Sequence, residues 1–208
     1  TRAALAGGTT TVLDFAEPLR GCSLASALDT WHGRADGRAS CHYSFHMTIK
    51  DWDPRIRAEL KDMTAAGITS YKVYLAYDNL RVSDAAAYEV IRAVGEEGGV
   101  LGCHCENGDL VTEGIRAQKA AGHMGPSAHP RSRPPLVEAE AIDRWLSIAE
   151  LAGYPVNIVH LSTRRGLEVA RAARSRGQEL YIESCPQYFL LNESKYQLPG
   201  FESAKFVL

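Results

Sequence analysis

The sequence predicts an α/β fold built on a parallel sheet, of the partial (β/α)8-barrel type. Short runs of β-branched and aromatic residues alternate with amphipathic helical stretches along all 208 residues, and no linker or repeat interrupts them. About six such βα units fit an incomplete barrel and an open doubly wound sheet equally well. No glycine-rich phosphate-binding loop follows any predicted strand, and this absence favours the barrel.

Six strands are predicted from runs in which β-branched, aromatic and other apolar residues dominate. Because helical stretches separate these runs, we expect the strands to pair in parallel. In chain order they are Thr9 to Ala16, Cys41 to Ile49, Ile68 to Ala76, Val100 to Cys105, Val156 to Ser162 and Glu179 to Ser184.

Helices are predicted between the strands from capping residues and from the spacing of apolar residues. With their caps, they are Asp53 to Gly67, Ser83 to Val94, Glu138 to Ala152 and Thr163 to Gly177; the first six residues also have a helical pattern. The stretch from Gly122 to Pro135 is rich in Gly, Pro and Ser, so it is predicted to be one long irregular loop.

Composition excludes several classes of protein. The chain has 23 basic and 25 acidic residues, a net charge of -2, and no basic stripe, so no nucleic-acid-binding face is predicted. No apolar run approaches the roughly 20 residues that span a membrane. The five cysteines are an odd number without regular spacing, which indicates reduced thiols in a cytoplasmic protein.

Three polar residues lie near the C-terminal ends of predicted strands: Lys72, His104 and His160. Active sites of parallel barrels are built at this end of the strands. The pleat of a strand places Lys72 on the face opposite Tyr71, and it places His160 opposite Val159. The three side chains are therefore predicted to converge.

A lysine inside an apolar strand is costly to bury as a cation, so its pKa is lowered. The neutral amine can add carbon dioxide and become a carbamate, an anionic ligand that bridges two metal ions while imidazoles complete the coordination. The structural alternatives are a buried ion pair for Lys72 and a hydrogen-bonded core position for each histidine. Taken together and in this order, the three residues indicate a metal site.

At these residues the chain resembles the cyclic-amide branch of the amidohydrolase superfamily, most closely the dihydropyrimidinases, which are also called D-hydantoinases. The resemblance covers essentially the whole length, and as a set its motifs are specific. The matching stretches are ALAGGTTTVLDFA (4 to 16), SYKVYLAY (70 to 77), HCENGDL (104 to 110), SRPPLVEAE (132 to 140), IVHLSTRRG (158 to 166) and ESCPQY (183 to 188).

The resemblance implies roles for single residues. Lys72 corresponds to a carboxylated lysine that bridges two zinc ions, and His104 and His160 correspond to ligands of one of them. Tyr77 corresponds to the tyrosine that binds the substrate carbonyl and the oxyanion; its structural alternative is a rim aromatic packed under a loop. The implied enzyme is a cytoplasmic homo-oligomer, a tetramer in the family, which opens dihydropyrimidine or 5-substituted hydantoin rings to N-carbamoyl amino acids.

Other parts of the family pattern have no match in this chain. The sequence contains no His-x-His pair for the other metal, and it has no counterpart of the family's metal-binding aspartate or β-sandwich domain. Residues 1 to 208 therefore resemble barrel strands two to seven. We expect these residues by themselves to be inactive and to hold at most one metal ion.

Two other functions fit the same pattern. An allantoinase or dihydroorotase uses the same metal chemistry on another ring, although the stretches from His104 to Asp109 and from Cys185 to Tyr188 favour dihydropyrimidinase. A non-catalytic scaffold, like the dihydropyrimidinase-related proteins, is the second alternative. Such scaffolds have lost metal ligands, so the presence of Lys72, His104 and His160 argues against it.

Overall fold

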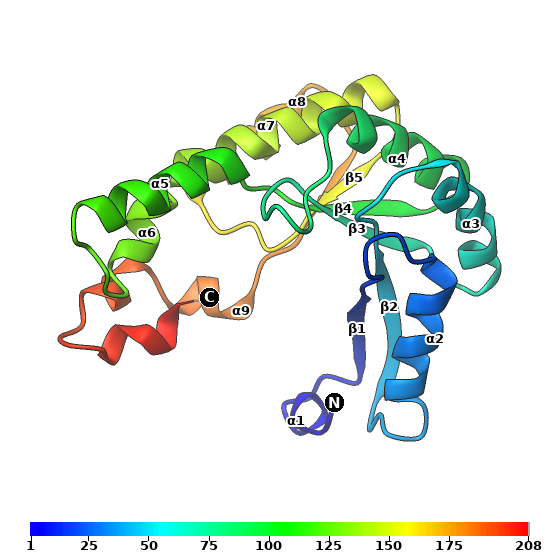
Figure 1. Ribbon diagram of the computed structural model, residues 1–208, viewed down its shortest axis with the longest axis horizontal. Coiled ribbons are helices and arrows are strands. Elements are labelled where there is room, and N and C mark those ends of the chain that lie inside the picture. Colours follow the sequence, from blue (N-terminus) through cyan, green and yellow to red (C-terminus); the bar gives the residue numbers. More distant parts are fainter. Residues whose placement is uncertain (208) are drawn as a thin grey trace.

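Six parallel strands form one sheet in the computed structural model, which describes residues 1–207 (Figure 1). Each strand pairs with the next one along the chain, so the strand order never reverses. A doubly wound sheet contains such a reversal, and its absence within the described sheet confirms the predicted partial barrel. The strands are β1 (Thr11–Ala16), β2 (His42–Thr48), β3 (Ser70–Tyr74), β4 (Val100–His104), β5 (Val156–Ile158) and β6 (Leu180–Ile182).

All six predicted strands are confirmed, and each is shorter than its predicted range. The largest difference concerns β5, which ends at Ile158 and not at Ser162. The backbone turns directly after it, because His160 has a φ of 40°, a left-handed conformation that a pleated strand does not contain. The strand-alternation argument for His160 was therefore wrong, and the turn sets the direction of this side chain.

The helices α2, α3, α4, α7 and α8 lie along the convex side of the curved sheet (Figure 1). Every predicted helix is confirmed, while α2, α5, α6 and α9 have no predicted counterpart. The helices are α1 (Arg2–Ala6), α2 (Leu24–Ala35), α3 (Pro54–Ala65), α4 (Asp84–Glu96), α5 (Gly108–Ala120), α6 (Ala128–Ser132), α7 (Pro135–Ala152), α8 (Arg164–Ser175) and α9 (Pro186–Leu190), followed by two 3-10 helices, η1 (Glu193–Gln197) and η2 (Glu202–Phe206).

The prediction of an irregular loop from Gly122 to Pro135 was wrong in its second half, where α6 lies. This short helix packs closely on α5, since a Cβ atom at Gly114 would come within 2.5 Å of the Ser132 carbonyl oxygen. Ser132 is buried in this contact. Tertiary packing therefore stabilises a helical turn that the local composition does not indicate.

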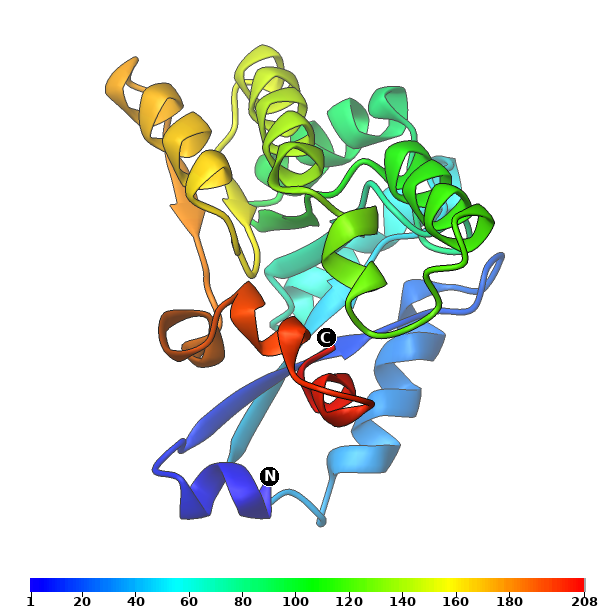
Figure 2. The same cartoon turned by 90° about the vertical axis from the view of Figure 1, so that its left-hand side faces the viewer.

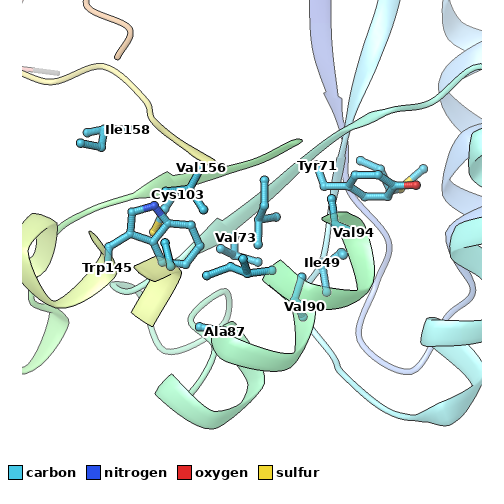
Figure 3. Close-up of a cluster of buried hydrophobic side chains, with 14 of the residues drawn as sticks. Ile49, Tyr71, Val73, Ala87, Val90, Val94, Cys103, Trp145, Val156 and Ile158 are labelled. Carbon is cyan, nitrogen blue, oxygen red and sulfur yellow. The ribbon is translucent and has the colours of Figure 1, made fainter. Parts of the chain in front are cut away.

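The hydrophobic core lies between the sheet and the outer helices (Figure 3). Tyr71 and Val73 of β3 and Cys103 of β4 point into it, together with the fully buried Trp145 of α7. Strand alternation then places Lys72, between Tyr71 and Val73, on the inner face of the sheet. The core thus determines which side chains face the concave side of the barrel.

The 3-10 helix η1 in the C-terminal segment lies close to α6 (Figures 1 and 2). The rings of His129 on α6 and Tyr196 on η1 stack with their centroids 5.9 Å apart. No helix within residues 1–207 is long and apolar enough to cross a membrane. The five cysteines are all free thiols, as expected.

Helix α4 offers a test of the capping analysis. The Ser83 hydroxyl accepts a hydrogen bond from the backbone N–H of Ala86, at 3.2 Å. We expect Ser83→Ala to lower the free energy of unfolding by about 1 kcal/mol, because that N–H loses its partner. Urea unfolding of the full-length protein measures the change. The control is Ser175→Ala, because Ser175 is the last residue of a different helix, α8, and is not a cap residue. An equal loss of unfolding free energy in both variants would contradict the prediction.

Candidate active site

Lys72 is almost fully buried, with 2% of its surface exposed. Its ammonium group lies 3.9 Å from the centre of the Tyr74 ring. Burial lowers the pKa of Lys72 to about 8, and the nearby acidic groups only partly oppose this shift. Among residues 1–207 no carboxylate lies within ion-pair distance of Lys72, and Glu17 pairs with Lys50, at 3.1 Å. The structural alternative for Lys72, a buried ion pair, is thus not observed in the described residues.

The imidazole rings of His104 and His160 lie in contact with each other. His104 is the last residue of β4, His160 lies in the turn after β5, and 3.0 Å separates His104 Nδ1 from His160 Nε2. Two nitrogen ligands of one tetrahedral metal ion, each about 2.0–2.1 Å from it, lie roughly 3.3 Å apart, so the observed separation is close to that of a ligand pair. Burial lowers the pKa of His160 to about 4, helped by the charges of His104 and Lys72, which keeps its imidazole neutral.

A carboxylate orients the other side of His104. Glu106 Oε2 lies 3.2 Å from His104 Nε2, and Glu106 Oε1 lies 3.4 Å from Arg133. Burial by itself would raise the pKa of Glu106, but the hydrogen bond from His104 and the charges of His104 and Arg133 outweigh burial and lower it. When Nε2–H donates to this carboxylate, Nδ1 of His104 presents its lone pair toward His160.

Tyr77 lies beside the histidines on the rim. Its φ of 67° is left-handed, and its carbonyl oxygen accepts hydrogen bonds of 2.8 Å from the N–H groups of Leu80 and Arg81. This turn places the Tyr77 ring 5.1 Å from the His104 ring, with 43% of its surface exposed. Partial burial raises the pKa of Tyr77, and Glu106 adds to the shift. The phenol is thus an accessible O–H donor next to the two imidazoles.

Tyr74 connects these groups, because its ring contacts both Lys72 and the His104 ring, whose centroid is 5.7 Å away. His46 of β2 has a structural role: its Nδ1 lies 2.6 Å from the Ser70 hydroxyl. His46 and Lys72 also line a cavity of about 30 Å³ on the inner face of the sheet. The structure therefore brings Lys72, His104, His160 and Tyr77 to one face of the sheet.

From sequence alone, Glu106 is equally compatible with holding His104 and with a solvated loop position, and Arg133 is not indicated at all. The signal that could have found Glu106 is its spacing, since it follows His104 by two residues. Arg133 offered no local signal, because it approaches Glu106 only through the fold of α6 against α5. Asn107 accepts a hydrogen bond from the N–H of Leu110 as the cap of α5.

A pair of imidazoles and a buried amine are a donor set suited to zinc once the amine carries a carboxyl group. Within residues 1–207 no three His, Cys, Asp or Glu side chains gather closely enough to hold a metal ion. Lysine is not among those four residue types, and in its carbamate form Lys72 would supply the third ligand. The residues present therefore fit one zinc ion, provided that Lys72 is carboxylated.

Comparisons with known proteins agree in sequence and in structure. The chain is 38% identical over 209 residues to the D-hydantoinase of Geobacillus stearothermophilus, covering all of this chain and 44% of that protein. It is 38% identical over 185 residues to the dihydropyrimidinase of Rattus norvegicus, covering 88% of this chain and 36% of that protein. The D-hydantoinase structure from a Bacillus sp. AR9 matches all of this chain and 46% of its own length with a TM-score of 0.97 and 37% identity.

No protein-family model matches the sequence. The chain spans less than half the length of the curated relatives it matches. Within that span the whole sequence aligns and the fold is shared almost completely. The chain therefore belongs to the D-hydantoinase and dihydropyrimidinase family.

Proposed function

We propose that the full-length protein hydrolyses cyclic amides, opening dihydropyrimidine or 5-substituted hydantoin rings to N-carbamoyl amino acids. The observation that carries the proposal is the pair of imidazole nitrogens 3.0 Å apart, beside the buried Lys72. It is supported by relatives at 37–38% identity that are named D-hydantoinase and dihydropyrimidinase. Burial keeps the His160 imidazole neutral, with a lone pair for a metal ion, and favours the neutral Lys72 amine that can be carboxylated, so the arrangement favours a metal centre.

The proposed centre contains two zinc ions bridged by carboxylated Lys72. His104 and His160 would hold one ion together with carboxylated Lys72, which would also be this chain's ligand to the second ion. Bound zinc would supply Lewis acidity toward the ring carbonyl and would activate water at neutral pH.

The remaining residues have proposed roles that follow from their contacts. Tyr77 donates its O–H toward the carbonyl oxygen, which becomes an oxyanion during hydrolysis. Glu106 and Arg133 hold His104 in the tautomer that directs Nδ1 toward His160. Tyr74 packs between Lys72 and His104, and its ring shields one side of the Lys72 amine from water.

A substrate panel with metal analysis tests the proposal. We expect the purified full-length protein to contain zinc and to open dihydrouracil and hydantoin faster than allantoin or dihydroorotate. Removal of the metal by a chelator should abolish turnover, and added zinc should restore it. Preferred turnover of allantoin or dihydroorotate would assign the protein to a related ring opening, and a metal-free protein without turnover on any ring would identify a scaffold.

A further inference from the structure

We infer that Glu138 of α7 is a positioning residue that holds the His160 turn in its metal-binding conformation. The inference rests on the proposed function, because it assigns a role toward a metal ligand. The side-chain hydrogen bonds of Glu138 go to Ser162 and Thr163, two and three residues after His160.

One carboxylate satisfies four donors of this turn. Glu138 Oε1 accepts from the Ser162 N–H at 2.8 Å and from the Ser162 hydroxyl at 2.9 Å. Glu138 Oε2 accepts from the Thr163 N–H at 2.9 Å and from the Thr163 hydroxyl. Hydrogen bonds to an ionised acceptor are stronger than neutral ones, so both backbone groups are firmly held.

The turn needs this support. His160 has a positive φ of 40°, and a non-glycine residue keeps such a conformation only when its surroundings enforce it. Directly after His160, the Leu161 N–H donates to the Glu183 carbonyl oxygen at 2.8 Å, which ties the turn to the segment after β6. Glu138 supplies the second tie, at Ser162 and Thr163. Together the two ties leave the turn that carries His160 little freedom to relax toward a negative φ.

The helix that carries Glu138 is held rigidly, and the Glu138 carboxylate interacts favourably with the N-terminus of α8. Helix α7 is anchored in the core by Ile142 and Trp145, both fully buried. Thr163 is the N-cap of α8, so the Glu138 carboxylate lies at the positive end of that helix. The absence of a side chain at Gly166 makes room for it, because a Cβ atom there would lie 2.9 Å from Glu138 Oε2.

The experiment compares zinc affinity among variants of the full-length protein. Glu138→Gln keeps the size of the side chain but removes its charge and one acceptor oxygen. Ser162→Ala removes only the hydrogen bond from the Ser162 hydroxyl to Glu138. Because Ser162 is exposed, this variant tests the contact between Glu138 and the turn without destabilising the core. Glu150→Gln is the matched control, since Glu150 is an exposed glutamate on the same helix. Zinc affinity is measured by competition with a chelator, and ligand geometry by the absorption spectrum of the cobalt(II)-loaded protein.

We expect Glu138→Gln to weaken zinc binding by about 10- to 100-fold and to change the cobalt(II) spectrum, as loss of a group that orients a ligand does. Ser162→Ala should weaken binding less, and Glu150→Gln should match the wild type. Equal zinc affinity and equal spectra in Glu138→Gln and wild type overturn this inference alone, even if the variant unfolds at a lower temperature. A wild-type protein that binds no zinc overturns the proposed function and this inference with it.

Discussion

Replacing Lys72 with alanine in the full-length protein is expected to abolish metal loading at the bridge and nearly all turnover. Lys72 is the one side chain of the proposed centre that would contact both ions, and alanine cannot form a carbamate. Because a metal centre contributes several kcal/mol to transition-state stabilisation, we expect kcat to fall by about 10³-fold or more. Zinc content per chain and the rate of hydantoin opening are the two measurements.

The control for this substitution is Lys61→Ala, which removes an exposed lysine from the outer face of α3. Its zinc content and rate should equal those of the wild type. Circular dichroism verifies that Lys72→Ala keeps its secondary structure, since truncation of a buried side chain also destabilises the fold. A folded Lys72→Ala protein with full zinc content would rule out the carbamate.

Replacing Tyr77 with phenylalanine is expected to leave zinc bound and to lower kcat by about 10²- to 10³-fold. The Tyr77 ring lies 5.1 Å from the His104 ring, so its hydroxyl is the proposed donor to the developing oxyanion. The ring itself is kept in Tyr77→Phe, and the turn that carries it is held by backbone hydrogen bonds. The loss should therefore appear in kcat and not in zinc content.

Tyr88→Phe serves as the comparison, because Tyr88 lies on α4 on the outer side of the sheet. Both phenylalanine variants lose one phenolic hydroxyl, and only that of Tyr77 belongs to a ring beside the histidines. If Tyr77→Phe retains the kcat of the wild type, Tyr77 has no part in the reaction and is a rim aromatic. Because Lys72→Ala is expected to lose the metal and Tyr77→Phe to keep it, the pair separates metal binding from oxyanion stabilisation.

The alternation of residues in β3 was sufficient to predict the direction of Lys72. Tyr71 and Val73 are apolar and enter the core, so the residue between them faces the inner side of the barrel. The same argument failed for His160, because the residues after Ile158 have strand-like composition but follow a left-handed turn. The apolar composition of this stretch predicts that its side chains can be buried. It does not predict the backbone conformation of the His160 turn, which depends on the hydrogen bonds that the turn makes with other segments.

The secondary-structure elements also divide into those that local sequence predicts and those that depend on tertiary packing. The helix that begins after Asp53 was predictable from its cap, its proline and its apolar spacing, all of which act locally. Helix α6 was not, because it depends on close packing against Gly114, about fifteen residues away along the chain. The strands β2 to β6 also end earlier than their predicted ranges, since the ladder stops where the neighbouring strand no longer provides a partner.

By itself, the sequence determined the parallel partial barrel, the inward direction of Lys72 and the placing of His104 at a strand end. These follow from hydrophobic periodicity and capping, which are local properties of the chain. Only the tertiary structure decided the 3.0 Å contact of His104 with His160, the approach of Arg133 to Glu106 and the tie from Glu138 to the His160 turn. Those contacts join residues 24 to 56 positions apart, so they depend on how strands and helices pack and not on any local pattern.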